Sequence, residues 1–445
     1  MRNPQLSVRA GEMSRRDFLR LSAALAAAGA AAAPRESRAS VKTRAHIVIV
    51  GGGAAGLTAA AKLSGWLDGA KITLVDARRE HWYQPGFTLV ANGVYQQSDV
   101  IRQTGDYVSS GVEWIPEMVA EIDPDANTVV TSGGKRLKYD FLVVALGLEL
   151  NWEGIDGMDP KLVGTNGIGC TYAGPDGAAA TFRASQQFLE TGGTGLFTKP
   201  GTPMKCAGAP IKAAFLTASR MVNAGTRGKG EVIYLADNDK LFAQPETAAL
   251  VKRHFDEKKI GYEFGHVLTA IEPGKREAIF RTPKGEITRR YDYIHVVPPM
   301  RAVQPVRSSA LAWKEGALAG GGWLEVDKRT LQHRRYPNVF GVGDTNGTPA
   351  GKTAATVKKG TPIAMQNLVS VIDGKAPGEK FDGYTSCPLI TDVGHAALIE
   401  FNDEFKLTPT LPLIDPLDSN WFAWSIKLYM LRPLYLQMLH GRVPA

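Results

Sequence analysis

Residues 45–56 read Ala-His-Ile-Val-Ile-Val-Gly-Gly-Gly-Ala-Ala-Gly, an apolar run that ends in a glycine-rich turn. A helical run follows over residues 57–67, and residues 71–75, Lys-Ile-Thr-Leu-Val, form a second apolar run that ends at Asp76. The order strand, Gly-x-Gly-x-x-Gly, helix, strand and acid is typical of a Rossmann-type dinucleotide-binding unit. The sequence therefore predicts that a dinucleotide-binding domain opens the folded part of the chain.

The residue types in this turn suit a pyrophosphate. Gly51 makes the tight turn, Gly53 lets the phosphates approach the backbone, and Gly56 allows close packing of helix and strand. The phosphates would sit on the helix N-terminus, and Asp76 is placed to bind ribose hydroxyls. The predicted contacts with the dinucleotide are Gly51, Gly53, Ala54, Ala55, Gly56 and Asp76.

Composition and charge restrict the class of protein. Of the 445 residues, 44% are hydrophobic and 22% are charged, which is ordinary for a globular protein and excludes disordered, collagen-like and polytopic membrane chains. Two or three domains fit this length. The formal net charge is +8, and residues 1–39 hold seven Arg against three acidic residues. The rest of the chain is only mildly basic, which argues against a nucleic-acid partner.

The first 39 residues are predicted to be a signal segment outside the fold. Residues 14–20 read Ser-Arg-Arg-Asp-Phe-Leu-Arg, and an Ala-rich apolar stretch follows over residues 21–33. Twin arginines before Phe-Leu resemble a twin-arginine export signal, with cleavage after Ala39 or Ala33. A basic disordered tail is the alternative. The signal predicts a periplasmic protein that is exported folded, commonly with a cofactor inside.

Two later segments indicate which dinucleotide binds. Residues 139–147 read Tyr-Asp-Phe-Leu-Val-Val-Ala-Leu-Gly, and residues 336–344 read Tyr-Pro-Asn-Val-Phe-Gly-Val-Gly-Asp. Both resemble the later fingerprints of the flavoprotein disulfide reductase superfamily, whose members have two dinucleotide domains. That resemblance implies bound FAD, with Asp344 on the ribityl chain. The further FAD-binding residues that it implies are Ala145, Gly147, Gly343, Asp344 and Lys352.

The second nucleotide domain of that superfamily normally carries NAD(P)H. Its first strand falls on residues 194–197 and its next strand on residues 231–235, but the loop over residues 198–210 lacks Gly-x-Gly-x-x-Gly. The loop holds Pro and Cys where backbone amides would bind a pyrophosphate. We therefore expect a Rossmann-like domain that has lost its nicotinamide ligand, so that the electrons come from another donor.

Three cysteines are too few for a disulfide scaffold. Cys206 follows Lys205 and precedes Lys212, and positive charge at the start of a helix lowers a thiol pKa. Cys387 lies in residues 382–388, which read as a turn-rich segment. The alternatives are a small buried side chain for a single cysteine, or a structural disulfide for a pair in an oxidising compartment.

Longer motifs resemble the sulfide:quinone oxidoreductase family, in particular the group that includes the mitochondrial enzyme. The most specific are residues 203–212, Pro-Met-Lys-Cys-Ala-Gly-Ala-Pro-Ile-Lys, and residues 384–389, Tyr-Thr-Ser-Cys-Pro-Leu. Further matches are Tyr83-Gln-Pro85, residues 297–300, residues 331–344 and Lys352-Thr-Ala-Ala355. The resemblance implies an enzyme in which a Cys206–Cys387 redox pair and FAD oxidise sulfide to sulfane sulfur, persulfide or polysulfide and pass two electrons to membrane quinone.

The resemblance also implies roles for individual residues. Hydrosulfide attacks the disulfide, or a sulfur-bridged form of it, and Cys387 keeps the sulfur as a persulfide for an unidentified acceptor. The Cys206 thiolate acts at the flavin ring. Lys352 is expected either near the flavin, where a cation would stabilise the reduced form, or as a solvated loop residue. Cys170, where this group usually has Ser, is a resolving thiol, a sulfur-relay site or a buried replacement for Ser.

Residues 411–439 are rich in Leu, Trp, Tyr and Met, with apolar residues at helical spacing. Lys427, Arg432 and Pro433 interrupt the run, which makes it a poor spanning helix and a reasonable interfacial one. The alternative is a helix packed on the protein's own core or on a second subunit. We expect a membrane-docking region whose removal, from about residue 411 onward, spares sulfide-driven flavin reduction.

The predicted fold is α/β, with two Rossmann-like domains and a C-terminal amphipathic region that docks on the membrane. The predicted boundaries are residues 1–39 for the signal, 40–160 and 296–370 for the FAD-binding domain, 161–295 for the second Rossmann-like domain and 371–445 for the region with Cys387 and the membrane interface. No Cys, His or carboxylate cluster has metal-ligand spacing, so we expect no metal and structural histidines.

Three rival functions remain at this point. They are the flavin subunit of a flavocytochrome c-type sulfide dehydrogenase that feeds a cytochrome partner, a type II NADH dehydrogenase, and a flavin-bearing partner protein without turnover. The quinone type, the sulfur acceptor and the oligomeric state stay open, with a homo-oligomer as one option.

Overall fold

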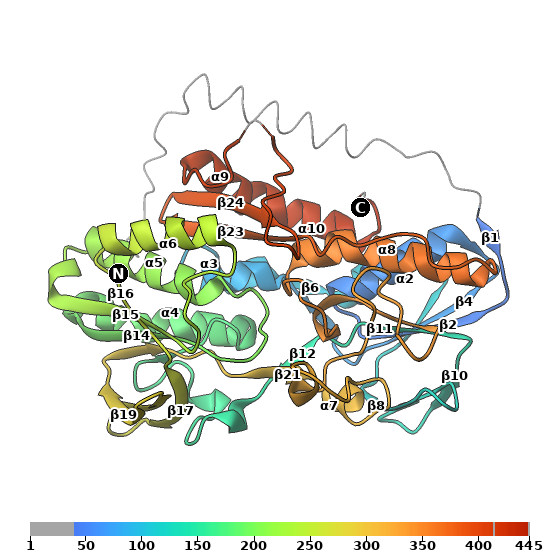
Figure 1. Ribbon diagram of the computed structural model, residues 1–445, viewed down its shortest axis with the longest axis horizontal. Helices are drawn as coiled ribbons and strands as arrows, with labels where there is room; N and C mark the ends of the chain where they lie inside the picture. Colours follow the sequence, from blue (N-terminus) through green and yellow to red (C-terminus); the bar gives the residue numbers. More distant parts are fainter. Residues whose placement is uncertain (1–39, 413, 444–445) are drawn as a thin grey trace.

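The computed structural model describes residues 40–412 and 414–443, so the predicted signal segment lies outside the described residues. The described chain forms two lobes side by side, one mainly blue and orange and the other mainly green and yellow (Figure 1). The red C-terminal elements lie across the top of both lobes in this view. Each lobe contains a five-stranded parallel sheet, which confirms the predicted α/β fold with two Rossmann-like units.

The first sheet has the order β22-β11-β2-β4-β7, and all of its strands are parallel. Its strands are β2 (His46–Val50), β4 (Lys71–Val75), β7 (Val112–Ile115), β11 (Phe141–Val144) and β22 (Val339–Gly341). The central strands are apolar throughout because both faces of a parallel sheet are covered. Ile47 packs with residues of the helices α2 (Ala54–Trp66) and α8 (Ala354–Ile372), and Val48 packs on the opposite face.

The second sheet has the order β13-β20-β14-β15-β16 and is also parallel. Its strands are β13 (Ile168–Gly169), β14 (Gly193–Lys199), β15 (Gly230–Ala236), β16 (Gly261–Phe264) and β20 (Tyr293–His295). Its helices are α4 (Gly174–Thr191), α5 (Ala209–Asn223) and α6 (Pro245–Glu257). The loop between β14 and α5 carries Cys206, so the strand-loop-helix order expected from the sequence is present.

Smaller elements complete the lobes. The antiparallel sheets are β8 (Val119–Asp123), β9 (Thr128–Thr131) and β10 (Arg136–Lys138), and β17 (Val267–Glu272), β18 (Glu277–Thr282) and β19 (Gly285–Arg290). The paired strands are β1 (Val41–Lys42) with β3 (Leu67–Asp68), β5 (Glu80–Trp82) with β6 (Ile101–Gln103), and β12 (Leu148–Leu150) with β21 (Met300–Ala302). The short helices are α3 (Phe87–Val90) and α7 (Gln304–Arg307). The pair β12 and β21 lies between the lobes in Figure 1.

The C-terminal elements form a layer over both lobes. The hairpin of β23 (Thr385–Asp392) and β24 (His395–Phe401) packs on α5. The helix α9 (Trp421–Ser425) continues through a π-helical turn, Ile426–Met430, into α10 (Leu431–Leu439). Because α9 packs on β24 and α10 packs on α2, this layer ties the second lobe to the first.

Most of the apolar face of this C-terminal segment packs against the two lobes and is buried. Trp424 is 3% exposed and packs with Leu89 and Ile390, and Tyr435 lies against the glycine-turn lobe, where its hydroxyl lies 2.7 Å from His81 Nε2. Removal of the segment from about residue 411 would uncover core residues of both lobes, and the prediction that it spares sulfide-driven flavin reduction stays a prediction. What remains on the surface is a smaller patch that includes Tyr429, which is 71% exposed.

We expect Trp424→Ala to destabilise the protein by about 3–5 kcal/mol, since it leaves a cavity between α9 and the two lobes. Tyr429→Ala, five residues away on the same segment, should change stability by no more than about 0.5 kcal/mol because the ring faces solvent. Thermal or denaturant unfolding of both variants gives the comparison. Equal stabilities of the two variants would contradict the packing described above.

Candidate active site

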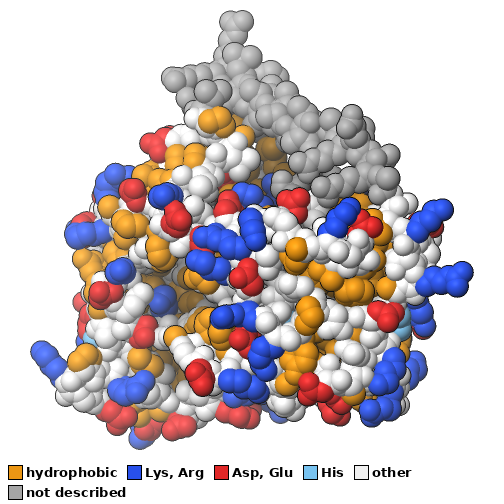
Figure 2. All heavy atoms as spheres, turned by 45° about the vertical axis from the view of Figure 1, so that its right-hand side comes forward, with side chains coloured by type: hydrophobic (Ala, Val, Ile, Leu, Met, Phe, Trp, Pro, Cys, Tyr) orange, Lys and Arg blue, Asp and Glu red, His pale blue; other side chains and the backbone are white. Residues whose placement is uncertain are grey.

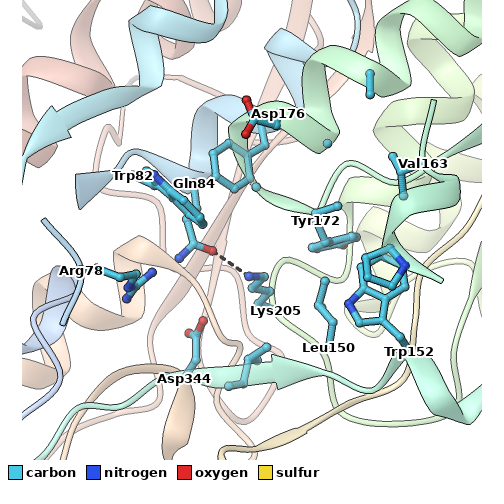
Figure 3. Close-up of a pocket in the computed structure, with 18 of the residues that line it drawn as sticks. Arg78, Trp82, Gln84, Leu150, Trp152, Val163, Tyr172, Asp176, Lys205 and Asp344 are labelled. Atoms are coloured by element: carbon cyan, nitrogen blue, oxygen red, sulfur yellow. Dashed lines mark hydrogen bonds between the residues drawn. The ribbon is translucent and has the colours of Figure 1, made fainter. Parts of the chain in front are cut away.

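A cavity of about 540 Å³ opens between the two lobes, beyond the carboxyl ends of the first sheet (Figure 3). Arg78, Gly147 and Asp344 line it from the first lobe, and Tyr172 and Lys205 line it from the second. In an open parallel sheet this is the usual place for a ligand, because loops from several strands converge there. Figure 3 shows the side chains of Arg78, Lys205 and Asp344 turned toward one another across the cavity.

The glycine turn has the geometry that a dinucleotide needs. Gly51 has φ +103°, and a side chain there would come within 2.4 Å of the Ala145 carbonyl oxygen. A side chain at Gly56 would come within 1.7 Å of the Gly51 carbonyl oxygen, whereas a side chain at Gly53 would meet open space. The first two glycines are therefore required by packing, and Gly53 leaves its side of the helix start open to a ligand. Ala54 begins α2 at this point.

The two predicted acids follow two strands of the first sheet, β4 and β22, which are separated by β2 and β11. The Asp76 carboxylate accepts a hydrogen bond from Gly52 N at 2.5 Å and lies 3.7 Å from Arg78 Nε. Burial raises the pKa of Asp344, against the charges of Lys205 and Lys352. None of the residues 40–412 and 414–443 donates a hydrogen bond to the Asp344 side chain, which faces the cavity. That carboxylate is available to the hydroxyl groups of a ligand.

Lys352 holds the loop that follows Asp344. Its ammonium donates to the carbonyl oxygens of Asp344, at 2.8 Å, and Asn346, at 2.6 Å, and lies 4.0 Å from the centre of the Trp323 ring. Burial lowers the pKa of Lys352 to about 8. Its carbonyl oxygen accepts a hydrogen bond from Cys206 N at 2.9 Å. The residue therefore supports the site from behind, and it is not a solvated loop lysine.

Cys206 and Cys387 lie together beside one ammonium. Lys212 Nζ is 3.3 Å from Cys206 Sγ and 3.8 Å from Cys387 Sγ. Cys206 sits in the left-handed region at φ +46°, just before α5 begins, and Lys212 is on the first turn of that helix. Cys387 sits on β23 and not in a turn, because residues 385, 387 and 389 alternate into the core. A side chain at Gly208 would come within 2.6 Å of its sulfur, so this glycine leaves the space that Cys387 fills.

The environment shifts the pKa values of the two thiols in opposite directions. The hydrogen bond from Cys387 and then the charge of Lys212 hold the pKa of Cys206 well below its usual range. The same hydrogen bond, together with burial, holds the pKa of Cys387 above its usual range. Only a thiolate is a nucleophile or a good leaving group in disulfide exchange. Cys206 is therefore the stabilised thiolate of the pair.

A second buried lysine near the pair was missed in the sequence. Lys427, from the π-helical turn, is 3% exposed, and its Nζ donates to the Pro85 carbonyl oxygen at 2.8 Å. Burial and the charge of Lys212 lower its pKa to about 7, while both cysteine sulfurs act in the opposite direction. The available signal was a lysine inside an apolar run, which from the sequence alone is only an interruption of the helix.

Cys170 differs chemically from Cys206 and Cys387. It packs in the same apolar cluster as Met204 and Tyr172. It is fully buried, and burial raises its pKa to about 12. Its backbone N–H donates to Thr181 Oγ1 at 2.7 Å. The Tyr172 hydroxyl donates to the Cys206 carbonyl oxygen at 3.0 Å, on the side of the loop that faces the cavity. This environment favours the reading of Cys170 as a buried replacement for Ser.

The histidines serve the packing of the fold. Burial lowers the pKa of both His81 and His295 to about 4. His81 contacts the Tyr435 hydroxyl, and His295 Nε2 lies 2.7 Å from Thr171 Oγ1. Over the part of the chain that the structure describes, no group of three or more His, Cys, Asp or Glu could hold a metal ion.

We expect Lys212→Gln to raise the pKa of the Cys206 thiol, because it removes the cation next to the sulfur. Alkylation of Cys206 by iodoacetamide in the reduced protein should be nearly independent of pH between about 6 and 8. In the variant it should fall about tenfold per pH unit below the new pKa. Lys199→Gln, which removes a lysine at the end of the preceding strand, is the control. Peptide mass spectrometry reports the site, and identical pH profiles would contradict the assignment.

Comparisons with known proteins agree with this fold. Residues 45–173 match the family model described as pyridine nucleotide-disulphide oxidoreductase, and residues 12–32 match the model of the twin-arginine translocation signal sequence. The chain therefore carries a signal for export to the periplasm by the twin-arginine route. A crystal structure of the sulfide:quinone oxidoreductase from Aquifex aeolicus superposes with a TM-score of 0.75 at 22% identity, covering 90% of this chain and 93% of that one, which shows a shared fold.

Relatives of known function extend over nearly the whole chain. The mitochondrial sulfide:quinone oxidoreductase of Dictyostelium discoideum is 35% identical over 404 residues, which are 90% of this chain and 87% of the relative. The mitochondrial enzyme of Mus musculus is 34% identical over 401 residues, which are 89% of this chain and 87% of the relative. These matches give no support to the flavocytochrome c-type alternative. Because this similarity spans both lobes and both cysteine motifs, the chain belongs to the sulfide:quinone oxidoreductase family.

Proposed function

We propose that this protein oxidises sulfide to sulfane sulfur, held as a persulfide or released as polysulfide, and passes two electrons through FAD to membrane quinone. The observation that carries the proposal is the position of Lys212 Nζ, within 4 Å of the sulfurs of both Cys206 and Cys387. Two adjacent thiols with opposite pKa shifts suit one that leaves as a thiolate and one that keeps a sulfur atom.

A flavin is the cofactor that the family implies, and FAD is the form that fits the site. We assign its pyrophosphate to the open side of Gly53 and the first turn of α2, its ribose to Asp76 and its ribityl chain to Asp344. When bound, FAD supplies the two-electron chemistry between the sulfur pair and quinone. The protein supplies placement, charge and a water-poor environment for that chemistry.

The sulfur step is a thiol–disulfide exchange at Cys206 and Cys387. In the disulfide form of the pair, hydrosulfide attacks Cys387 Sγ, a new S–S bond forms there, and the Cys206–Cys387 bond breaks. Cys206 leaves as a thiolate, beside the ammonium of Lys212, which lies 3.3 Å away. Once an acceptor has removed the outer sulfur from Cys387, closing the disulfide again releases two electrons and the thiol proton. When it is protonated, Lys427 would add positive charge for the negative charge that builds up here, since both cysteine sulfurs favour its charged form.

Membrane attachment is proposed for the exposed part of the C-terminal segment. Tyr429 is 71% exposed and Leu434 is 40% exposed, and both lie on the elements that connect α9 to the end of the chain. Of the helices in the described residues, none is long and apolar enough to cross a bilayer. An aromatic and an aliphatic side chain at the surface suit insertion at the headgroup level, which would bring the protein to its quinone.

We expect Cys206→Ser and Cys387→Ser each to retain FAD and to lose flavin reduction by sulfide, since each removes one half of the exchange. Cys170→Ser should keep a rate within about threefold of the wild type. Stopped-flow bleaching of the flavin under anaerobic conditions measures all three variants. NADH should bleach none of them. Near-normal bleaching by sulfide in both Cys206→Ser and Cys387→Ser would refute the proposed function.

The double variant Tyr429→Asp/Leu434→Asp should lose most of its binding to phospholipid vesicles and most of its decylubiquinone reduction with vesicle-bound quinone. Charge at these positions opposes insertion. Its flavin should still be reduced by sulfide at the wild-type rate. Val222→Asp replaces another exposed apolar residue, 61% exposed on the second lobe, and serves as the matched control. Vesicle co-sedimentation that is equal in both variants would place the membrane contact elsewhere.

A further inference from the structure

The hairpin of β23 and β24 carries Cys387 and lies on α5 of the second lobe (Figure 1). Over the part of the chain that the structure describes, its hydrogen bonds and ion pairs with that lobe fall at two places. At the first place, Lys212 Nζ lies 3.8 Å from Cys387 Sγ. The second place is Asp392, at the far end of β23, and no step of the proposed chemistry uses it.

Asp392 is bound by two helices of the second lobe. Its carboxylate accepts hydrogen bonds from the Ser219 hydroxyl, on α5, and from the Lys258 ammonium, at the C-cap of α6. The Ser219 hydroxyl in turn accepts from Val393 N at 3.2 Å. Burial raises the pKa of Asp392, but the hydrogen bonds from Lys258 and Ser219 outweigh burial and hold the pKa below its usual range. The contact is therefore charge-assisted and directed, which makes it a strong one.

Both places of contact lie on one helix. Lys212 and Ser219 are seven residues apart on α5, which is about two helical turns, so they share a face. Their partners, Cys387 and Asp392, are five residues apart on β23. A β-bulge between Ile390 and Asp392 adds a residue to this strand, and a bulge re-aims the side chains next to it. The strand thus meets the helix at two points, which together define its position along the helix.

The apolar contacts between strand and helix define that position less sharply. Leu389 packs in one cluster with Ile211 and Phe215 of α5. The hydrophobic effect is non-directional, whereas a hydrogen bond weakens steeply with poor distance or angle. A disulfide needs Cα atoms about 4.4–6.8 Å apart, and a slip of one residue moves a strand by about 3.3 Å. The directed contacts of Asp392 therefore oppose a movement that the cysteine pair cannot tolerate.

The other end of the strand is held by the first lobe. Thr385 Oγ1 lies 3.0 Å from Thr353 Oγ1, at the N-cap of α8. Thr353 follows Lys352, whose carbonyl oxygen accepts the N–H of Cys206. Cys387 lies between this contact and Asp392, so its strand has one anchor on each lobe.

We propose that Asp392 is a positioning residue, which fixes β23 along α5 and thereby keeps Cys387 within bonding reach of Cys206. This inference rests on the proposed function, because it takes these two cysteines as the redox pair. In that function the bond between them breaks and must close again in each cycle. An anchored strand returns the Cys387 sulfur to the same place, and a displacement of about 1 Å can cost about a hundredfold in rate.

Arsenite measures the spacing of the two thiols without sulfide or turnover. It forms one As–S bond to each sulfur and releases two water molecules, so no electrons are exchanged. In the FAD-loaded enzyme, reduced anaerobically with a phosphine, the Kd for arsenite should rise about tenfold in Asp392→Ala, because both sulfurs must be in place. Stopped-flow reduction of the flavin by sulfide should slow by a similar factor.

Further variants separate position from stability. Asp392→Asn keeps an acceptor of the same shape, so its Kd should stay within about threefold of the wild type. Lys258→Gln should raise the Kd about threefold, and Lys252→Gln, which removes the lysine of an exposed ion pair on α6, should leave it unchanged. Ile122→Ala opens a cavity in the first lobe, in another apolar cluster than that of Cys387. It should lower the melting temperature and keep the Kd within about twofold.

The contrary results are distinct. An unchanged Kd for arsenite in Asp392→Ala overturns the inference, and so does an equal rise in Ile122→Ala, which shows general loosening. If Asp392→Ala does not fold, the comparison of Lys258→Gln with Lys252→Gln decides by the same measurement. A wild-type enzyme that binds arsenite but whose flavin is not reduced by sulfide refutes the proposed function, and the comparison of Kd values still tests the position of the pair.

Discussion

The ammonium of Lys212 lies between two sulfur atoms, 3.3 Å from Cys206 and 3.8 Å from Cys387, in a place that is nearly closed to water. A buried cation is costly unless an anion or several polar groups stabilise it. Here the Cys206 thiolate does so, which raises the pKa of Lys212 and lowers that of Cys206 together. The chemistry of the site therefore depends on a charge pair that burial strengthens.

Several distant parts of the fold hold the residues of that pair in place. The loop from β14 to α5 holds Cys206 and Lys212, the hairpin β23–β24 brings Cys387 onto α5, and the Lys352 carbonyl from the first lobe accepts the Cys206 N–H. Three segments that are distant in the chain therefore meet at the cysteine pair. Because the second lobe keeps the Rossmann architecture without its glycine loop, it presents cysteine and lysine at the position where a related domain would bind a nucleotide.

The C-terminal segment combines core packing, a buried lysine near the redox pair and exposed apolar residues. Its inner face packs on both lobes and buries Lys427, whose charge interacts with both cysteine sulfurs, while Tyr429 and Leu434 remain at the surface. Figure 2 shows one face of the whole molecule, on which hydrophobic side chains are interspersed with charged ones, as in ordinary globular proteins.

Local sequence determined the parts of this protein in which neighbours along the chain act together. The strand-turn-helix at residues 45–66, the lost glycine loop of the second lobe, and Lys212 near Cys206 follow from spacing, because a tight turn or one helical turn fixes those distances. Only the tertiary structure decided that Cys387 is on a buried strand, that Lys352 binds carbonyl oxygens, and that Lys427 is buried with its ammonium on the Pro85 carbonyl oxygen. These depend on contacts between residues far apart in sequence, and a lysine in an apolar run has the same local pattern whether its ammonium ends in solvent or buried against a carbonyl oxygen.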